Sequence, residues 1–512
     1  MVIKMKKRII CLLLAVAMMF AFCACGDGQG KKDTRKDKNE IVVGISQDMG
    51  DSLNPYQMTA AGTKEILTNV YEGLYKVAPS GDYIPAVAES YTVSEDGLVY
   101  SFVIRKDVKF HNGAAVTAED ILYSFSTCAE KTVDSSLPAV LEGISVNSTK
   151  AENGQDLIVI TLPAANNDFL AYASMVYIIP SGSSDACASS PVGTGPFKYV
   201  SRSVQENIVF ERFDEYWGEK AKLAKVTCKI CEDATALVAA LNAGAIDMCS
   251  HLTLDQINGL GEKYEILEGT MNLVQALYLN NAKAPFDDVR VRQAICYALD
   301  VDTILKLTAD GHGSKLGTSI YPAFQKYFDE SLINAYPYNP EKAAALLAEA
   351  GYADGFSMSV TVPSNYTPHV NAGQVVVQQL QAVGIKAELK EIEWNSWLDD
   401  VYKGRNFDST ITGFDASTLT ANALLSRWVS GASKNMIGFS DSRYDELMAQ
   451  ATAETDDSVR TQLYKQAAAI LSEQAANAYI QDLAEFTVLA KTLSGYNFYP
   501  LYRIDFSTVY YK

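Results

Sequence analysis

The sequence predicts an α/β fold built as more than one lobe, and two observations lead to this prediction. Runs with the apolar spacing of strands alternate along the chain with runs that have the spacing of helices, which is typical of α/β proteins. The chain also has 512 residues, which is more than one hydrophobic core normally serves, so two or three lobes are expected.

The predicted elements follow from local patterns. Strands are expected where apolar residues are continuous or alternate with polar ones, at residues 41–45, 100–105, 226–230, 273–280, 387–392 and 408–412. Helices are expected where an apolar stripe follows a start signal or precedes a stop, at residues 117–125, 339–350, 375–383, 440–451 and 459–471. Thr117 and Asn339 are predicted N-caps, and Gly351 and Gly384 are predicted to end their helices.

Residues 1–24 have the pattern of an export signal. Four cations precede an apolar run at residues 9–22, which is too short for a comfortable membrane span. The following Ala-Cys-Gly resembles a lipobox, so Cys25 is predicted to be the lipidated first residue, holding the protein at the outer face of the cytoplasmic membrane. Phe22 stands where Leu is usual, and plain secretion with Cys25 as an ordinary thiol is the alternative.

The composition of the mature chain limits its partners. Residues 25–40 are predicted to be a flexible tether, because residues 26–40 contain no large apolar side chain. Loss of the four signal cations changes the net charge from −18 to −22. So acidic a protein is not expected to bind nucleic acid or anionic lipid surfaces non-specifically. The cysteines are sparse and irregularly spaced, so no disulfide framework is predicted.

One group of residues has a superficial likeness to a zinc site. Cys228, Cys231, Cys249 and His251 offer four ligands of the right type. Residues 226–230 are predicted to form a strand, however, and positions three apart on a strand point to opposite faces. We therefore expect buried free thiols here, and no metal or other cofactor.

Motifs of common enzymes are missing from the sequence. It contains no G-x-S-x-G elbow, no H-E-x-x-H and no G-x-x-x-x-G-K-[ST] loop. Pro196 follows Gly193-Thr194-Gly195 and lacks the N–H that a dinucleotide loop would offer. Since catalytic groups also assemble in space, this pattern favours a binding protein over an enzyme without deciding the matter.

A series of motifs runs through the chain in one order. They are residues 71–74 (YEGL), 85–91 (PAVAESY), 96–102 (DGLVYSF), 104–113 (IRKDVKFHNG), 117–120 (TAED), 192–197 (VGTGPF), 244–247 (GAID), 288–294 (DVRVRQA) and 339–352. Together they resemble the dipeptide/oligopeptide family (family 5) of bacterial ABC-transporter extracellular solute-binding lipoproteins. Most of these residues are expected to hold the fold, with Gly73, Gly113 and Gly195 in turns where φ is positive.

The resemblance implies a two-lobed clamshell of the class II periplasmic-binding-protein type, with an additional α/β domain inserted in the first lobe. Lobe I would comprise residues 41–70, 191–270 and 486–512, the extra domain residues 71–190, and lobe II residues 271–485. Ligand would bind between the lobes and be enclosed when they close. The protein, as a monomer, would then deliver it to permease subunits that work with a cytoplasmic ATPase.

The resemblance also implies a peptide cargo, with one departure from the family pattern. Peptide-binding members bind the ligand's α-ammonium group with the Asp of a Gly-Trp-x-x-Asp stretch, which matches residues 413–418 here. Phe414 replaces the Trp, and Ser417 stands at the Asp position. In an extended chain Asp415 shares a face with Ser417. Either Asp415 binds the ammonium group, or it caps a turn and that pocket is lost.

Further cleft residues are predicted near the two lobe crossings. Tyr278, Tyr479 and Gln481 are candidates for ligand contact, with core packing as the alternative for each tyrosine. Arg427 is either a partner for a ligand carboxylate or a surface cation. Trp394 and Trp397 are expected to pack within lobe II.

Two rival functions remain open at this point. The same scaffold can carry a nickel chelate, haem or an oligosaccharide, because fold does not determine function. Four histidines without a cluster argue mildly against metal or haem. An extracellular hydrolase is the second rival, and the fate of added peptide separates it from a binding protein.

Overall fold

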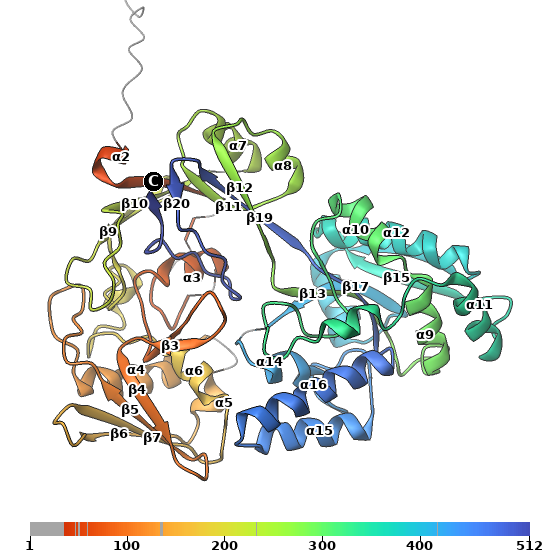
Figure 1. Cartoon of the computed structure of the whole chain (residues 1–512), viewed down its shortest axis with the longest axis horizontal. Coiled ribbons are helices and arrows are strands. Elements are labelled where there is room, and N and C mark those ends of the chain that lie inside the picture. The colour runs from red at the N-terminus through yellow and green to blue at the C-terminus, as the bar shows by residue number, and fades with distance from the viewer. Residues whose placement is uncertain are drawn as a thin grey trace, which may run out of the picture.

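The computed structural model describes residues 35–46, 48–49, 52–58, 60–133, 137–231, 233–416 and 418–512. Two lobes lie side by side and are joined by strands that pass between them (Figure 1). A smaller sheet lies beside the first lobe. The predicted two-lobed α/β clamshell with an extra domain is confirmed. None of the helices in these ranges has the length and apolar character needed to cross a membrane.

The sheet of lobe I has seven strands in the order β12-β19-β11-β1-β10-β9-β8. In chain order these are β1 (Glu40–Ile45), β8 (Phe197–Ser203), β9 (Asn207–Arg212), β10 (Lys225–Ile230), β11 (Met248–Leu252), β12 (Tyr264–Thr270) and β19 (Ala484–Ala490). β1 is parallel to β10 and β11, and the other neighbours are antiparallel. The helices of this lobe are α3 (Ala61–Leu67), α7 (Ala234–Asn242) and α8 (Leu254–Asn258), and a short pair, β20 (Leu493–Ser494) with β21 (Tyr510–Tyr511), lies near the C-terminus.

The end of the predicted tether is held against lobe I. Arg35–Lys38 form a short helix, α2, and the Arg35 guanidinium lies 3.0 Å from the Asp247 carboxylate. The same guanidinium donates a hydrogen bond to the Gly244 carbonyl oxygen. Residues 35–40 therefore differ from the predicted flexible segment, because an ion pair with a distant loop fixes them.

The extra domain is built on an antiparallel sheet with the order β4-β5-β7-β6. Its elements are β2 (Tyr75–Val77), β3 (Tyr83–Pro85), β4 (Ala88–Val93), β5 (Val99–Ile104), α4 (Ala118–Lys131), α5 (Pro138–Leu141), β6 (Ser145–Lys150), β7 (Asp156–Thr161) and α6 (Phe169–Met175). Thr117 caps α4 in a reciprocal capping box with Asp120, as its sequence position predicts.

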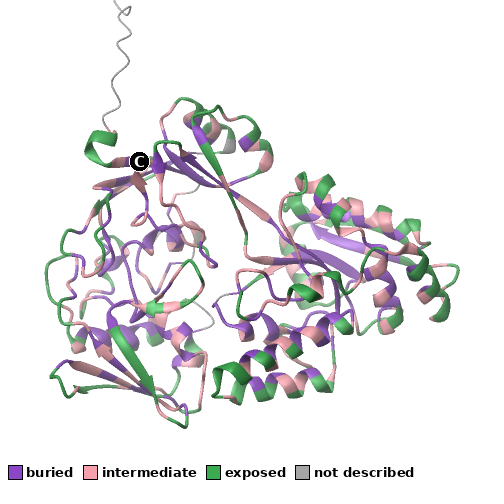
Figure 2. Cartoon of the chain, viewed as in Figure 1, coloured by how far each residue is buried: buried purple, intermediate pink, exposed green. Residues whose placement is uncertain are grey.

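Lobe II has a six-stranded sheet in the order β14-β18-β13-β17-β15-β16. The strands are β13 (Leu273–Leu279), β14 (Ser314–Lys315), β15 (Ser357–Pro363), β16 (Lys386–Ile392), β17 (Ser409–Asp415) and β18 (Asn477–Asp482). The helices are α9 (Val289–Ala298), α10 (Val301–Ala309), α11 (Pro340–Glu349), α12 (Thr367–Ala382), α13 (Trp394–Ser396), α14 (Ala421–Leu425), α15 (Ser442–Ala453) and α16 (Asp457–Glu473), with a π-helical turn at Trp397–Lys403. Buried residues fill the centre of each lobe, and exposed ones lie on the outer helices (Figure 2).

Helix α12 begins eight residues before the predicted start. The prediction placed the helix at residues 375–383, where the apolar spacing is clear. The structure starts it at Thr367, with Pro368 in the first turn. Proline is well suited to that position because its φ is already helical and its missing N–H would be unpaired there. The extension places His369 on the helix.

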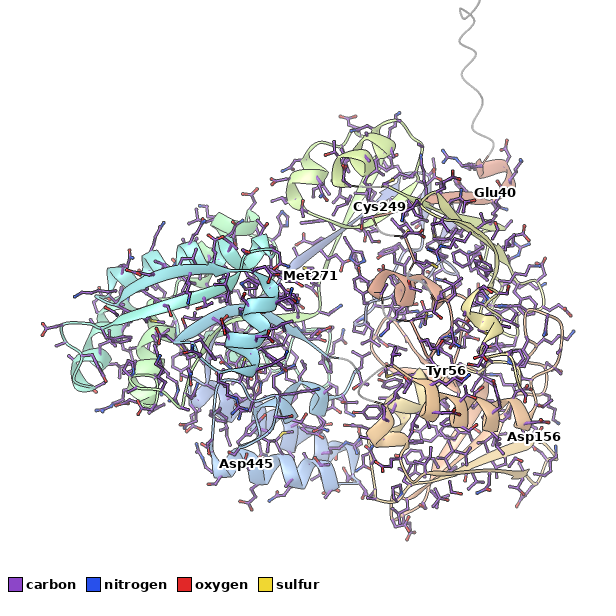
Figure 3. All side chains as sticks on the ribbon, turned by 180° about the vertical axis from the view of Figure 1, so that it is seen from behind. Glu40, Tyr56, Asp156, Cys249, Met271 and Asp445 are labelled. Atoms are coloured by element: carbon purple, nitrogen blue, oxygen red, sulfur yellow. The ribbon has the colours of Figure 1, made fainter. Side chains whose placement is uncertain are left out.

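Two chain segments cross between the lobes. β12 leads into β13 through Met271 and Asn272, and β18 leads into β19 through Leu483. The Met271 N–H donates a hydrogen bond to the Leu483 carbonyl oxygen at 2.8 Å, which ties the two crossings together. Figure 3 shows Met271 where the strands pass from one lobe to the other.

Of the three glycines predicted to have positive φ, only Gly113 does, at 86°. Gly73 and Gly195 are required for a different reason. A Cβ at Gly73 would lie 2.6 Å from the Ser174 carbonyl oxygen, and one at Gly195 would lie 2.4 Å from the Asn69 carbonyl oxygen. Here glycine permits close approach of two backbone segments, which local sequence does not reveal.

We expect Gly195→Ala to lower the free energy of unfolding by about 1–3 kcal/mol, because the new methyl group overpacks a backbone contact. The matched control is Gly259→Ala, where the nearest atom to the added Cβ is 3.7 Å away. Urea titration followed by circular dichroism measures both. Equal unfolding midpoints for the two variants would contradict the close-packing explanation.

Candidate functional site

A cavity of about 660 Å³ lies between the lobes beside the crossing strands. Its walls combine residues from the end of β1, helix α3 and the β11 region of lobe I with residues from α12, α13 and β17 of lobe II, and Met271 and Leu483 of the crossings also contribute. This volume falls within the usual range of small-ligand sites, and junctions between domains are common places for them. A smaller cavity of about 70 Å³ adjoins it and shares Glu65, His251 and Asp415.

A larger cavity of about 920 Å³ lies between the extra domain and lobe II. It is spanned by cross-lobe contacts, in which the Leu419 N–H donates to Tyr83 Oη and Asn167 Nδ2 donates to the Glu454 carbonyl oxygen. We place the candidate site in the cavity beside the crossings instead, because its walls include Met271 and Leu483 of the two crossings together with residues from both large lobes.

The free edge belongs to β17. This strand pairs with β13 along its whole length, from Ser409 to Asp415. On its other side β15 pairs with it only at Ser409 and Thr410. Ile411–Asp415 therefore has no strand neighbour on that side among the described residues. Thr412, Gly413 and Asp415 line the cavity, so the unpaired backbone faces the space between the lobes.

Asp415 is the exposed end of this edge. Its carboxylate makes no hydrogen bond or ion pair with the described residues and lines both adjoining cavities. The alternative prediction, that Asp415 caps a turn, stays a prediction, because Ser417, two residues further on, lies outside the described residues. Gly413 and Asp415 lie on one face of β17, because side chains two apart on a strand point the same way.

The lobe I wall holds a buried charge cluster. His251 Nε2 lies 2.5 Å from Glu65 Oε1, and His251 Nδ1 lies 3.0 Å from Glu485 Oε1. The Tyr502 ring stacks on the imidazole, with ring centroids 4.6 Å apart and an interplanar angle of 13°. His251 has φ of 61°, a left-handed conformation that is strained for a residue other than glycine, at an irregularity between β11 and β19.

Two carboxylates keep His251 charged. Burial alone would lower the pKa of the imidazole, but hydrogen bonds with Glu485 and Glu65 outweigh it and raise the pKa to about 10. Burial raises the pKa of the Glu65 carboxyl, and its bond to His251 acts in the opposite direction. At neutral pH the imidazolium is thus present and both of its nitrogens are already used.

The lobe II wall is mainly aromatic. Tyr366 and Trp394 line the cavity and meet edge to face, with ring centroids 5.3 Å apart. His369 lies beside them, and burial lowers the pKa of its imidazole to about 4, so it is neutral at physiological pH. Gln275 Nε2 lies 2.8 Å from His369 Nδ1 and fixes the ring.

The other predicted cleft residues pack inside lobe II. Tyr278 is fully buried, with its hydroxyl donating to the Val274 carbonyl oxygen. Tyr479 is buried and bonds to Ser319 at 3.0 Å. Gln481 is buried and donates to Gln275, so it reaches the cavity only through Gln275 and His369. This corrects the prediction of direct ligand contact, because the side chains of these three residues point into the core.

Phe414 faces away from the cavity, on the side of β17 opposite Asp415. Its ring meets Tyr278 at 5.0 Å, and the Arg427 guanidinium lies 3.9 Å above its centre. Arg427 also donates to Tyr402 Oη and does not line the cavity. Trp397 is buried in lobe II as predicted. Ser417 and Cys25 lie outside the described residues.

The cysteine cluster is split between two cores. Cys228 packs in the main core of lobe I, whereas Cys231 and Cys249 pack in a smaller cluster across the sheet. The predicted strand, which places positions three apart on opposite faces, is confirmed as β10. No group of three or more metal-ligating side chains converges within the described ranges.

Several cavity residues have no signal in the sequence. These residues come from three distant segments of the chain, and none belongs to a recognisable motif: Glu65, Tyr366, and Glu485 with Tyr502. His251 was noted only as a possible zinc ligand. It is the next-to-last residue of β11, beside the loop that leads into α8, and functional side chains often gather in and beside loops.

We expect His251→Asn to lower the free energy of unfolding by about 3–5 kcal/mol at or below pH 6.5, because it leaves buried carboxylates without their partner. Asparagine tolerates positive φ, so the loss reports the charge rather than the backbone. A raised pKa in the folded state means that the stabilisation is complete below the ordinary pKa of 6.5 and disappears as pH rises towards about 10. Denaturant titration from pH 5 to pH 10 measures the difference.

His312→Asn is the control for this variant. His312 forms an exposed pair with Glu268 at 2.9 Å, so its replacement should cost no more than about 1 kcal/mol. A stability difference between His251→Asn and the unchanged protein that stays constant across this pH range would rule out the charged pair.

Comparisons with known proteins agree with this architecture. The model of the middle region of bacterial extracellular solute-binding proteins, family 5, matches residues 82–436. The chain is 28% identical over 512 residues to the dipeptide-binding protein of Escherichia coli, covering 92% of this chain and 94% of the relative. It is 29% identical over 456 residues to heme-binding protein A of Haemophilus influenzae, covering 81% and 82% of the two chains.

A solved structure extends the comparison to the fold. DppA from Helicobacter pylori in complex with the peptide STSA superposes with a TM-score of 0.70 at 24% identity, covering 92% of this chain and 98% of that one. The family match spans well over half of the sequence. The protein therefore belongs to family 5 of the bacterial extracellular solute-binding proteins.

Proposed function

We propose that this protein is the binding component of an ABC importer and captures short peptides between its lobes. The observation that supports this most strongly is the edge of β17 at Ile411–Asp415, which has no strand neighbour among the described residues, lines the interlobe cavity and ends at the Asp415 carboxylate. A strand edge offers N–H and C=O groups that every peptide can pair with, so such recognition tolerates many sequences.

Asp415 would bind the α-ammonium group of the peptide. The carboxylate lies at the end of the free edge, where the first residue of an added strand would meet it. Hydrogen bonds between charged groups are shorter and stronger than neutral ones, so this contact would set the direction of the peptide. Beside it, the absence of a side chain at Gly413 accommodates Leu273, whose Cδ1 would lie 2.7 Å from an added Cβ.

Closure of the lobes would enclose the peptide. The two crossing segments are the only connections between the large sheets in the described chain, and they can bend without unpacking either core. A ligand favours the closed state only through contacts that it makes there, here with both cavity walls at once. The permease would then recognise the closed form.

We expect Asp415→Asn to weaken binding of a free tripeptide by about 10- to 150-fold, which corresponds to a charge-assisted hydrogen bond of about 1.5–3 kcal/mol. Isothermal titration calorimetry measures the affinity. N-acetylation of the peptide should cost the unchanged protein a similar factor and cost Asp415→Asn little, because both changes remove the same contact.

Asp354→Asn serves as the control, since Asp354 is exposed in a loop of lobe II that does not line the cavity. Peptide recovered from the complex should have its original mass. Failure of every di- to hexapeptide to bind would reject the proposal, and cleaved peptide would favour the hydrolase instead.

We also propose that Cys25 carries a lipid anchor at the outer face of the cytoplasmic membrane. Metabolic labelling with a palmitate analogue should label the full-length protein, and Cys25→Ser should abolish the label and release the protein into the soluble fraction. Labelling that persists in Cys25→Ser would disprove the assignment.

A further inference from the structure

The interlobe cavity has an unbalanced charge. Glu65 and Asp415 line it, and Glu485 lines the adjoining cavity. Among the described residues, His251 is the one cation on the wall of the interlobe cavity, and its two nitrogens bond to Glu65 and Glu485. His369 is buried and neutral. Within the described chain, the interlobe cavity thus has an excess of negative charge and no cation available to a ligand.

A single α-ammonium group does not neutralise this excess. If it pairs with Asp415, the cluster of two carboxylates and one imidazolium still carries a net negative charge. Arg503 lines the smaller cavity, lies 3.9 Å from the Asp505 carboxylate and against the Tyr499 ring, and does not line the interlobe cavity. Among the described residues, the interlobe cavity therefore has no second cation of its own, and a second positive charge there would have to come from the ligand.

Aromatic rings face the same space. Tyr366, Trp394 and Tyr502 all line the interlobe cavity. Tyr366 and Tyr502 are 42% and 52% exposed, although His251 covers one face of the Tyr502 ring. The face of an aromatic ring attracts organic cations, and the attraction increases when water is excluded. The Glu65 carboxylate and the Tyr502 ring of lobe I, together with the Tyr366 and Trp394 rings of lobe II, form surroundings that an organic cation prefers.

We propose that the cleft selects peptides that carry a second cationic group, a lysine or arginine side chain, which lies between the Glu65–His251–Glu485 cluster and the rings of Tyr502, Tyr366 and Trp394. This inference rests on the proposed peptide-binding function and names the class of peptide. Because the cationic group contacts both lobes, it favours the closed state, whereas an acidic side chain would be buried near like charges without a partner.

The test compares three tripeptide amides with free N-termini: Ala-Lys-Ala, Ala-norleucine-Ala and Ala-Glu-Ala. Norleucine keeps an unbranched hydrocarbon chain and removes the charge. We expect calorimetry at pH 7 to give the lysine peptide an affinity at least tenfold higher than the norleucine peptide, with the glutamate peptide weakest. Equal affinity of the lysine and norleucine peptides would overturn this inference and leave the proposed function standing. Absence of binding by any peptide would instead reject the proposed function.

A variant pair locates the selecting surface. Tyr502→Ala removes a half-exposed ring from the cavity, and Tyr338→Ala removes one of nearly equal exposure, 50%, that does not line it. We expect Tyr502→Ala to reduce the ratio of lysine to norleucine affinity by about 2- to 5-fold, and Tyr338→Ala to leave it unchanged.

A carboxylate variant tests the opposite wall. Glu485→Gln should reduce the same affinity ratio, whereas Glu265→Gln, on the exposed strand β12, should not. Thermal unfolding of each variant identifies any that fail to fold. Folded Tyr502→Ala and Glu485→Gln proteins that both keep the full preference for lysine would show that the selection arises elsewhere.

Discussion

The hydrogen bond between the Met271 N–H and the Leu483 carbonyl oxygen marks the constraint on which the rest of the structure depends. It joins the two segments that run from one large sheet into the other. Each crossing leads from a paired strand of lobe I to a paired strand of lobe II, and the short stretch between them belongs to neither sheet. The interlobe cavity lies beside this point, and Met271 and Leu483 contribute to its walls.

The Glu65–His251–Glu485 charge cluster lies next to the same crossing. Glu485 follows the crossing by two residues, and Glu65 lies on α3 of lobe I. His251 links them from a left-handed backbone position, which is strained and therefore needs strong local contacts to persist. Buried ion groups of this kind add little net stability compared with apolar packing. In the proposed selection of cationic peptides, the cluster contributes the negative charge on the lobe I wall.

Much of the fold was predictable because its signals are local. Thr117 and Asp120 form their capping box wherever the helix lies, and Asn339 followed by Pro340 starts a helix in the same way. The start of α12 was missed because its first turns contain few apolar residues. Gly195 was recognised as special for the wrong reason, since the Asn69 carbonyl that it accommodates lies more than 120 residues away.

The sequence by itself determined the α/β class and the family, because periodicity, caps and short motifs are encoded by neighbouring residues. Only the tertiary structure decided which side chains meet at the cavity. Strand alternation turns Phe414 into the core and Asp415 outward, and burial removes Tyr278, Tyr479 and Gln481 from the cleft. Glu65, His251, Glu485 and Tyr502 are brought together by the pairing of distant strands, and such long-range contacts leave no pattern in a single sequence.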